Sequence, residues 1–92
     1  MAITVRIPSP LRKLTNEQDT VTADSDGTLA QLIDVLENEY PGLKERMCDE
    51  TGELRRFVNI YINGEDVRFL SGLETAVGPG AEVSIVPAVA GG

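Results

Sequence analysis

Apolar and polar residues alternate near the start of the chain, where Ile3, Val5 and Ile7 are separated by Thr4 and Arg6. A period of two is typical of a strand with one buried face. The same alternation predicts further strands over residues 19–23, 57–62, 66–69 and 82–86. Their expected inward positions are Val21, Ala23, Val58, Ile60, Ile62, Val83 and Ile85.

A different spacing follows the second strand and predicts one amphipathic helix. The members of its apolar stripe are Leu29, Leu32, Ile33, Leu36 and, one turn later, Tyr40. Thr28 and Gln31 have the spacing of a capping box at its start, and Pro41 ends it. Residues 43–47 predict one further helical turn, whereas residues 11–18 and 48–53 are expected to be loops.

Two turn signals complete the pattern. Asn63-Gly64 is typical of a two-residue hairpin, and Gly78-Pro79-Gly80 predicts another turn. The expected order is strand, strand, helix, strand, short strand, strand and tail. One amphipathic helix on one half-buried sheet is a two-layer α+β domain. We therefore expect one domain over residues 1–87 and a flexible tail over residues 88–92.

Composition narrows the possible chemistry. The 92 residues include no histidine and one cysteine, and 15 acidic against 8 basic residues give a formal charge of −7. An imidazole base, an intrachain disulfide and a cysteine-rich zinc site are therefore excluded. The acidic balance disfavours nucleic-acid binding, and the sequence shows neither a secretory signal nor a membrane span. A cytoplasmic carrier or binding protein is expected rather than an enzyme.

Local motifs that suggest chemistry have simpler interpretations. Asp24-Ser25-Asp26-Gly27 lacks the closing glutamate of a calcium loop, so a turn leading into the helix is expected. Cys48 stands beside Asp49, and a carboxylate raises the pKa of a neighbouring thiol, which favours an unreactive cysteine. Gly78-Pro79-Gly80 lacks the following lysine of a phosphate-binding loop.

The basic residues and the aromatic residues each have two possible interpretations. Five cations either form a docking patch for an acidic partner or are scattered over the surface: Arg12, Lys13, Arg55, Arg56 and Arg68. An apolar strip for a partner is expected on the exposed face of the sheet. Phe57, Tyr61 and Phe69 are candidates for that strip, but the sequence is equally consistent with their lying in the core.

The end of the chain has a composition of its own. After the last strand, Pro87 removes a backbone donor and prevents the ladder from continuing. Ala88, Val89 and Ala90 are small or branched, and Gly91 and Gly92 place no side chain beside the final carboxylate. The six residues after the predicted strand can span roughly 20 Å, enough to insert a terminus into a narrow channel. A frayed end is the alternative.

These features together resemble a known family. The order of elements before a Gly-Gly terminus resembles the ubiquitin-like β-grasp, and residues 80–92 resemble the ending of bacterial sulfur carriers of the ThiS/MoaD family. Residues 57–69 and the Pro-Ala-Val-Ala-Gly-Gly ending resemble most its cysteine-biosynthesis branch. The resemblance spans the whole chain and implies a mixed sheet of four to five strands packed on one main helix.

The resemblance also implies a function. An E1-like adenylating enzyme would activate the Gly92 carboxylate with ATP and Mg²⁺, and sulfur would convert it to a thiocarboxylate. Gly91, Ala90 and Val89 would be recognised in the partner's channel. The further partners implied are a PLP-dependent cysteine synthase and a zinc metalloprotease or, in the runner-up branch, the large subunit of molybdopterin synthase. The carrier itself would bind no cofactor or metal and be monomeric when free. A ubiquitin-like modifier and a non-covalent binding module stay open.

Overall fold

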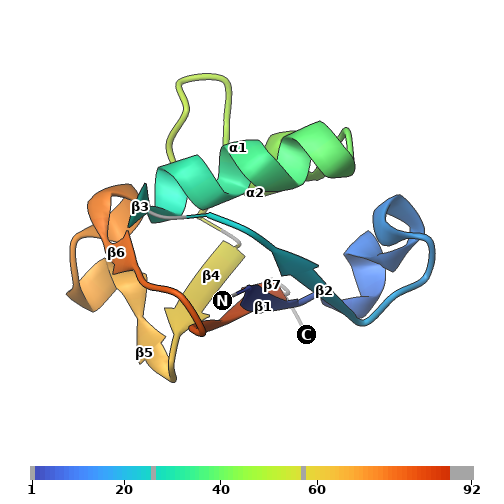
Figure 1. Cartoon of the computed structure of the whole chain (residues 1–92). Coiled ribbons are helices and arrows are strands. Elements are labelled where there is room, and N and C mark those ends of the chain that lie inside the picture. The colour runs from blue at the N-terminus through green and yellow to red at the C-terminus, as the bar shows by residue number, and fades with distance from the viewer. Residues whose placement is uncertain (1, 26, 57, 88–92) are drawn as a thin grey trace.

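A mixed sheet covered on one face by helix α1 forms the domain (Figure 1). The structure, a computed structural model, describes residues 2–25, 27–56 and 58–87. Five strands form the main sheet in the order β2-β1-β7-β4-β5. The central pair β1 and β7 is parallel, whereas the other neighbours are antiparallel. This is the ubiquitin-like β-grasp arrangement that the sequence predicts.

The strands follow the predicted alternation closely. Their bounds are β1 Ile3–Arg6, β2 Thr20–Ala23, β4 Val58–Ile62, β5 Glu65–Asp66 and β7 Glu82–Pro87. All the predicted inward positions in these strands are buried. The short return strand that was predicted over residues 66–69 is present as β5, but it ends at Asp66 because a 3-10 helix, Val67–Phe69, follows. The Asp66 side chain caps that helix by accepting from the Arg68 amide at 2.9 Å.

Helix α1, Leu29–Glu39, begins at the predicted capping box. The Thr28 amide donates to Oε1 of Gln31 at 2.8 Å, and the Gln31 amide donates to Oγ1 of Thr28 at 3.4 Å. Tyr40 is the C-cap, so it lies just beyond the helix rather than within it. Its side chain is half-buried. The predicted turn over residues 43–47 is helix α2, Leu43–Met47. The apolar stripe of α1 packs on the sheet.

Several short elements escaped prediction. Residues 9–15 form a 3-10 helix, Ser9–Thr15, where a loop was expected over residues 11–18. Burial of Leu11 and Thr15 gives this helix its inward side, and Oγ1 of Thr15 donates to the Gln18 carbonyl at 2.9 Å. A second, two-stranded sheet pairs β3, Gly27–Thr28, with β6, Ala76–Val77, after the 3-10 helix Gly72–Glu74.

Two glycine positions follow directly from the backbone. Asn63 and Gly64 have φ values of 51° and 88°, which is the left-handed pair required by a type I′ hairpin turn. At Gly27, an added Cβ would lie 1.7 Å from Oε1 of Gln31, the atom that caps α1. Gly27 therefore belongs to the helix entry that was expected here, although Asp26 lies outside the described residues.

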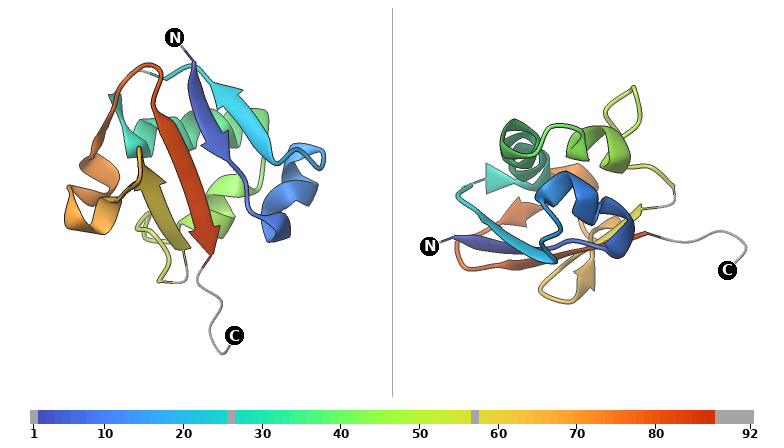
Figure 2. Two further views of the ribbon diagram at one scale, coloured as in Figure 1. Left: turned by 90° about the horizontal axis from the view of Figure 1, so that it is seen from below. Right: turned by 90° about the vertical axis from the view of Figure 1, so that its right-hand side faces the viewer.

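The layout places the end of β7 at one extremity of the domain. Strands β1 and β7 run in the same direction, and β7 ends at Pro87 at that extremity (Figure 2). The core between sheet and helix includes the fully buried side chains of Ile3, Val5, Leu32, Ile33, Ile60 and Val83.

Within the part of the chain that the structure describes, no helix has the length and apolar character needed to cross a membrane.

Candidate functional site

The predicted tail residues Val89, Ala90, Gly91 and Gly92 lie outside the described residues. The structure instead defines the segment from which that tail departs. We call the end of β7 at Val86 and Pro87, with the start of β4 opposite it, the tail root. The pairing of Val86 and Pro87 with β4 fixes where β7 ends.

The tail root belongs to the central strand of the sheet. Strand β7 pairs with β1 on one side and with β4 on the other, and Pro87 is the partner of Val58. The Asn63 amide donates to the Glu82 carbonyl at 2.8 Å, so hydrogen-bonded pairs alternate from there and Pro87 falls at a non-hydrogen-bonded position. The missing proline donor is therefore not needed by β4. The predicted strand end at Val86 was one residue early.

Arg68 stabilises the β4 side of the tail root through hydrogen bonds. Its Nη2 donates to the carbonyl of Val58 at 2.9 Å and to that of Arg55 at 3.0 Å, and Nη1 donates to Oδ1 of Asn59. One guanidinium thus joins the 3-10 helix after β5 to the segment that enters β4. The sequence carried no signal for this role, because the contacts depend on how the hairpin brings Arg68 back along β4.

The exposed face of the sheet is less apolar than expected. Tyr61 and Val86 lie on it among polar neighbours, with Tyr61 half-buried and Val86 43% exposed. Phe69 is 88% exposed and belongs to the 3-10 helix after β5, so it is neither a core residue nor a member of a sheet strand. Phe57 lies outside the described residues.

The five candidate cations are divided between two parts of the surface. Arg12 and Lys13 belong to the 3-10 helix that follows β1, whereas the others lie in the segment before β4 or in the one after β5. Several are occupied within the chain: Nε of Arg12 donates to the Ile7 carbonyl at 3.1 Å, and Nε of Arg55 donates to the Glu45 carbonyl at 3.0 Å. These hydrogen bonds leave the positive charges at the surface, and a docking patch for an acidic partner stays a prediction.

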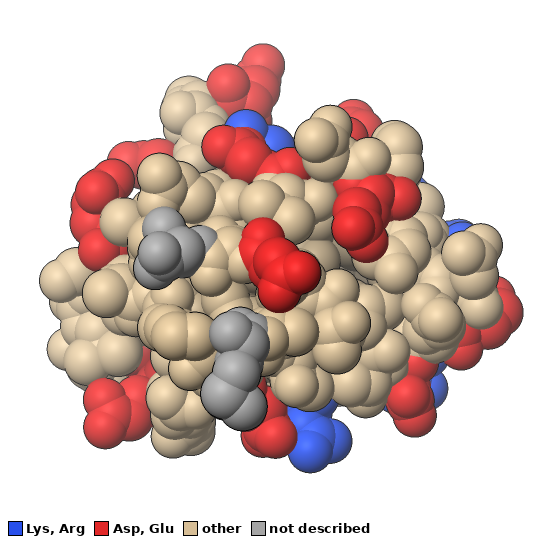
Figure 3. Space-filling model, in the orientation of Figure 1, with Lys and Arg blue, Asp and Glu red and all other residues tan. Residues whose placement is uncertain are grey.

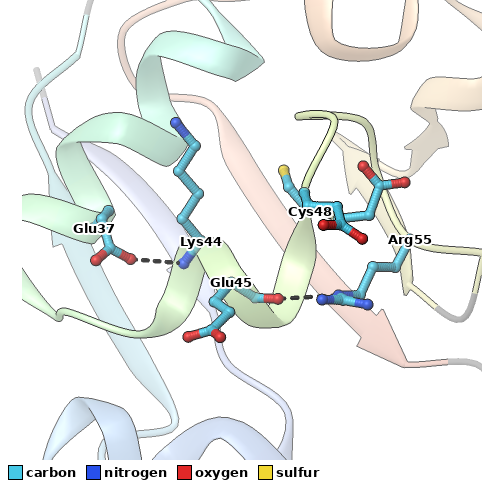
Figure 4. Close-up of a pocket in the computed structure, with 7 residues that line it drawn as sticks. Glu37, Lys44, Glu45, Cys48 and Arg55 are labelled. Atoms are coloured by element: carbon cyan, nitrogen blue, oxygen red, sulfur yellow. Dashed lines mark hydrogen bonds between the residues drawn. The ribbon is translucent and has the colours of Figure 1, made fainter.

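A polar hollow lies between α2 and the segment that follows it (Figure 4). Its lining side chains are Glu37, Lys44, Glu45, Cys48, Asp49, Glu50 and Arg55. Glu37 accepts from the Lys44 amide at 2.9 Å and so caps the start of α2, while Nζ of Lys44 pairs with Asp34 at 2.7 Å. The side chains of Glu37 and Lys44 are therefore engaged in local structure.

Cys48 is a buried thiol at the end of α2. Burial raises its pKa above the ordinary value of a cysteine thiol and outweighs the opposite effect of nearby Lys44, and Asp49 raises it further. The sequence predicted the direction from the carboxylates, whereas burial is the larger cause. Little thiolate exists at neutral pH, which makes Cys48 a poor nucleophile.

Acidic side chains do not gather into a metal site in the described part of the chain. Across residues 2–25, 27–56 and 58–87, no three His, Cys, Asp or Glu side chains are grouped as ligands for an ion. Asp49 is occupied locally, because its Oδ1 accepts from the amides of Thr51 and Glu53 at 2.9 and 3.2 Å. The hydrogen bond from the Thr51 side chain is the main cause that lowers the pKa of this carboxyl.

Comparison with known proteins adds the family context. The ThiS family matches residues 5–92. Sulfur carrier protein CysO of Mycobacterium tuberculosis is 52% identical over 94 residues, which cover all of both chains. Small archaeal modifier protein 3 of Haloferax volcanii is 42% identical over 69 residues, 75% of this chain and 74% of that one.

A solved structure extends the similarity to three dimensions. A chain of the Amycolatopsis orientalis BexX/CysO complex superposes with a TM-score of 0.92 at 45% sequence identity. The alignment covers 99% of this chain and 100% of that chain. The similarity therefore includes the tail root and the whole sheet.

Proposed function

The chain belongs to the ThiS family and is a CysO-like sulfur carrier, and we propose that its Gly92 carboxylate carries the sulfur as a thiocarboxylate. The observation that carries this proposal is the 52% identity to CysO over all of both chains. The proposed recipient pathway is cysteine biosynthesis, because the resemblance to CysO extends to the full length of both chains.

Activation would occur in an E1-like adenylating enzyme. A Gly92 carboxylate oxygen attacks the α-phosphorus of ATP, and pyrophosphate leaves with Mg²⁺, giving an acyl adenylate. Hydrosulfide then attacks the acyl carbon, and AMP leaves as the thiocarboxylate forms. Gly91 and Gly92 have no Cβ, so both faces of the reacting carbonyl stay accessible to the enzyme. Val89 and Ala90 would contact the walls of the channel that admits the tail.

Transfer would occur in a PLP-dependent cysteine synthase. The thiocarboxylate sulfur attacks the β-carbon of an aminoacrylate that the partner forms from O-phosphoserine by loss of phosphate. The product would be a thioester between the Gly92 carbonyl and the cysteine sulfur. Attack of the cysteine amine on that carbonyl, with the thiol as leaving group, would convert the thioester into an amide bond. A zinc metalloprotease would then add water across that bond, releasing cysteine and restoring the carboxylate. Each catalytic group belongs to a partner, and the carrier supplies one acyl carbon.

Features of the described residues support a carrier role. The pairing of β7 with β1 ends at Ser84, whereas its pairing with β4 continues to Pro87, so β4 holds the last residues of β7 in the sheet. Five residues beyond Pro87 reach about 17 Å when extended. Cys48, the single cysteine of the chain, is buried away from solvent and is not required by the proposed chemistry.

Mass spectrometry tests the proposal. The chain, a CysO-type activating enzyme, ATP, Mg²⁺ and sulfide should give a mass gain equal to replacement of one oxygen by one sulfur. Deletion of Gly92 should abolish the gain, whereas Cys48→Ala should leave it intact. A gain that survives deletion of Gly92, or one that disappears in Cys48→Ala, would overturn the assignment of sulfur to Gly92.

Protein modification is the second candidate function. The similarity to small archaeal modifier protein 3 favours it, and an acyl adenylate is equally suited to attack by a lysine amine. Isopeptide-linked adducts of Gly92 on other proteins, formed in the same reaction, would favour a modifier. A thiocarboxylate without such adducts would favour the carrier.

A further inference from the structure

Strand β2 leaves one border of the main sheet open. It is the first strand in the order β2-β1-β7-β4-β5, beside β1 (Figure 2, left). The Ile7 amide donates to the Asp19 carbonyl at 2.8 Å, so hydrogen-bonded pairs alternate along the β1–β2 ladder from that position. The N–H and C=O groups of Thr20 and Thr22 therefore point away from β1, along the open edge.

A groove runs along this edge beneath helix α1. The C-terminal half of α1 lies over β2 (Figure 1), and the groove is lined by residues 20–24 together with Val35, Glu39 and Tyr40. Val35 and Tyr40 are half-buried and supply apolar surface. A hydrogen bond of 3.4 Å from Oη of Tyr40 to Oε1 of Gln18 joins the two walls at one end. We call this feature the edge groove.

The charge of the edge groove has one sign. Asp24 and Glu39 are exposed and line it, and its described lining residues include no lysine or arginine. Figure 3 shows carboxylates spread over the face that carries α1 and the front of the sheet, with blue side chains near the border. A cationic ligand is therefore favoured over an anionic one.

We propose that the edge groove takes an extended, basic peptide segment of a partner protein as an added strand on β2. Its backbone would exchange hydrogen bonds with Thr20 and Thr22, as in β-strand addition. Alternate side chains would face Val35 and Tyr40, so apolar residues suit those positions. Lysine or arginine near the ends of the segment would lie close to Asp24 and Glu39.

A second copy of the chain fits the groove less well. Two β2 edges would bring together two sets of the same carboxylates on chains that each carry a formal charge of −7. Like charges placed side by side disfavour such a pair.

Occupation of the edge groove would leave the tail root accessible. Strand β1 separates β2 from β7, and the tail root is completed by β4 on the far side of β7. A partner could therefore hold the carrier by β2 while the tail reaches an active site. This inference concerns a different surface from the proposed chemistry at Gly92 and can fail independently of it.

A titration followed by NMR tests the proposal. The probe is a blocked heptapeptide with lysines flanking a valine-rich centre, added to the full chain at low salt. We expect saturable shifts at the amides of Thr20 and Thr22 and slower hydrogen exchange at both. Thr22→Pro should weaken binding at least about tenfold, because it removes an outward donor and obstructs the incoming strand. Its N–H points away from β1, so the β1–β2 ladder keeps its bonds.

Matched variants of chain and probe complete the test. Thr22→Val keeps the backbone donor and should bind as the parent chain does. If Thr22→Pro does not fold, probes N-methylated at the alternate amides that face β2 replace it and should not bind, whereas N-methylation of the outer amides should be tolerated. A glutamate-flanked probe should bind more weakly.

Several outcomes would overturn the proposal. One is that Thr22→Pro and Thr22→Val bind the lysine-flanked probe equally well, and another is that the two N-methylated probes bind equally well. Tighter binding of the glutamate-flanked probe than of the lysine-flanked one would also overturn it, as would self-association of the chain through the β2 edge. Thiocarboxylate formation, measured on Thr22→Pro in parallel, should be unchanged. Its loss in that variant would show that the edge serves the activating enzyme itself and would count against a separate docking site.

Discussion

Nη2 of Arg68 donates a hydrogen bond of 2.9 Å to the carbonyl of Val58, the residue paired with Pro87 across the β4–β7 ladder. The same guanidinium reaches the Arg55 carbonyl and the Asn59 side chain. The Arg68 side chain, which follows the hairpin, therefore holds β4, the strand with which the last residue of β7 pairs. The firmness of the tail root depends on a residue outside both strands that form it.

Replacement of Arg68 should loosen the start of β4. Arg68→Ala leaves the carbonyls of Arg55 and Val58 without this donor and should lower the free energy of unfolding by roughly 1–3 kcal/mol. Arg68→Lys keeps the charge but not the planar fork, and should fall between the parent and the alanine variant. Urea unfolding measures the difference. Equal stability of all three proteins would show that the contacts contribute nothing.

Alanine substitutions at Gly27 and Gly78 form a matched pair that tests the N-terminal cap of helix α1. In Gly27→Ala, the new Cβ displaces the Gln31 side chain from its capping position, and loss of the cap should cost about 1 kcal/mol. An added Cβ at Gly78 meets no atom within 4 Å, so Gly78→Ala should change stability by less than about 0.5 kcal/mol or raise it slightly. Thermal unfolding of both variants decides the matter; a similar loss in each would contradict the steric explanation.

Val67 and Phe69 belong to one 3-10 helix but differ in burial. Val67 is fully buried, whereas Phe69 is 88% exposed. Val67→Ala should destabilise the domain by roughly 1–3 kcal/mol, since two buried methyl groups are lost and a cavity remains. Phe69→Ala should change it by less than about 0.5 kcal/mol despite removing a larger side chain. The reverse order in denaturant unfolding would place Phe69 in the core.

The Cys48 thiol should make stability depend on alkaline pH. Its pKa is raised in the folded chain, so the unfolded chain releases the thiol proton first as the pH increases. The stabilising contribution is complete below about pH 8.5 and is lost as the pH rises towards the folded pKa.

A comparison with Cys48→Ala isolates this effect from the titration of lysine and tyrosine. The parent chain should lose unfolding free energy more steeply above pH 9 than Cys48→Ala does, in urea unfolding with reducing agent present. Parallel pH profiles for the two proteins would show that the thiol pKa is not raised by folding.

Most of the sheet and the main helix were predictable because each has a strong local pattern. The alternation around Val5, Ile60 and Val83, and the capping box at Thr28 and Gln31, depend on neighbours in the sequence. Their bounds in the structure differ from the predicted ones by a residue or so. Local periodicity identifies an element when its own residues decide which side is buried.

The remaining elements depend on distant partners. Gly27 pairs with Val77, and the helical turn at Val67 forms because that residue packs into the core. Neither contact leaves a periodic signal in so few residues. The role of Arg68 could not be predicted for the same reason, because its hydrogen bonds form only when β4 and the following hairpin are folded. The tail chemistry was inferred from resemblance alone, since Gly91 and Gly92 carry no side chain to read.

Gly92 is proposed to carry sulfur destined for cysteine, and an isotope transfer follows that sulfur from the chain to its product. The chain loaded with ³⁴S as a thiocarboxylate would be incubated with a PLP-dependent cysteine synthase and O-phosphoserine, followed by a zinc metalloprotease. We expect ³⁴S in free cysteine and recovery of the chain at its unmodified mass. Label retained on the chain, or cysteine formed without ³⁴S, would contradict it.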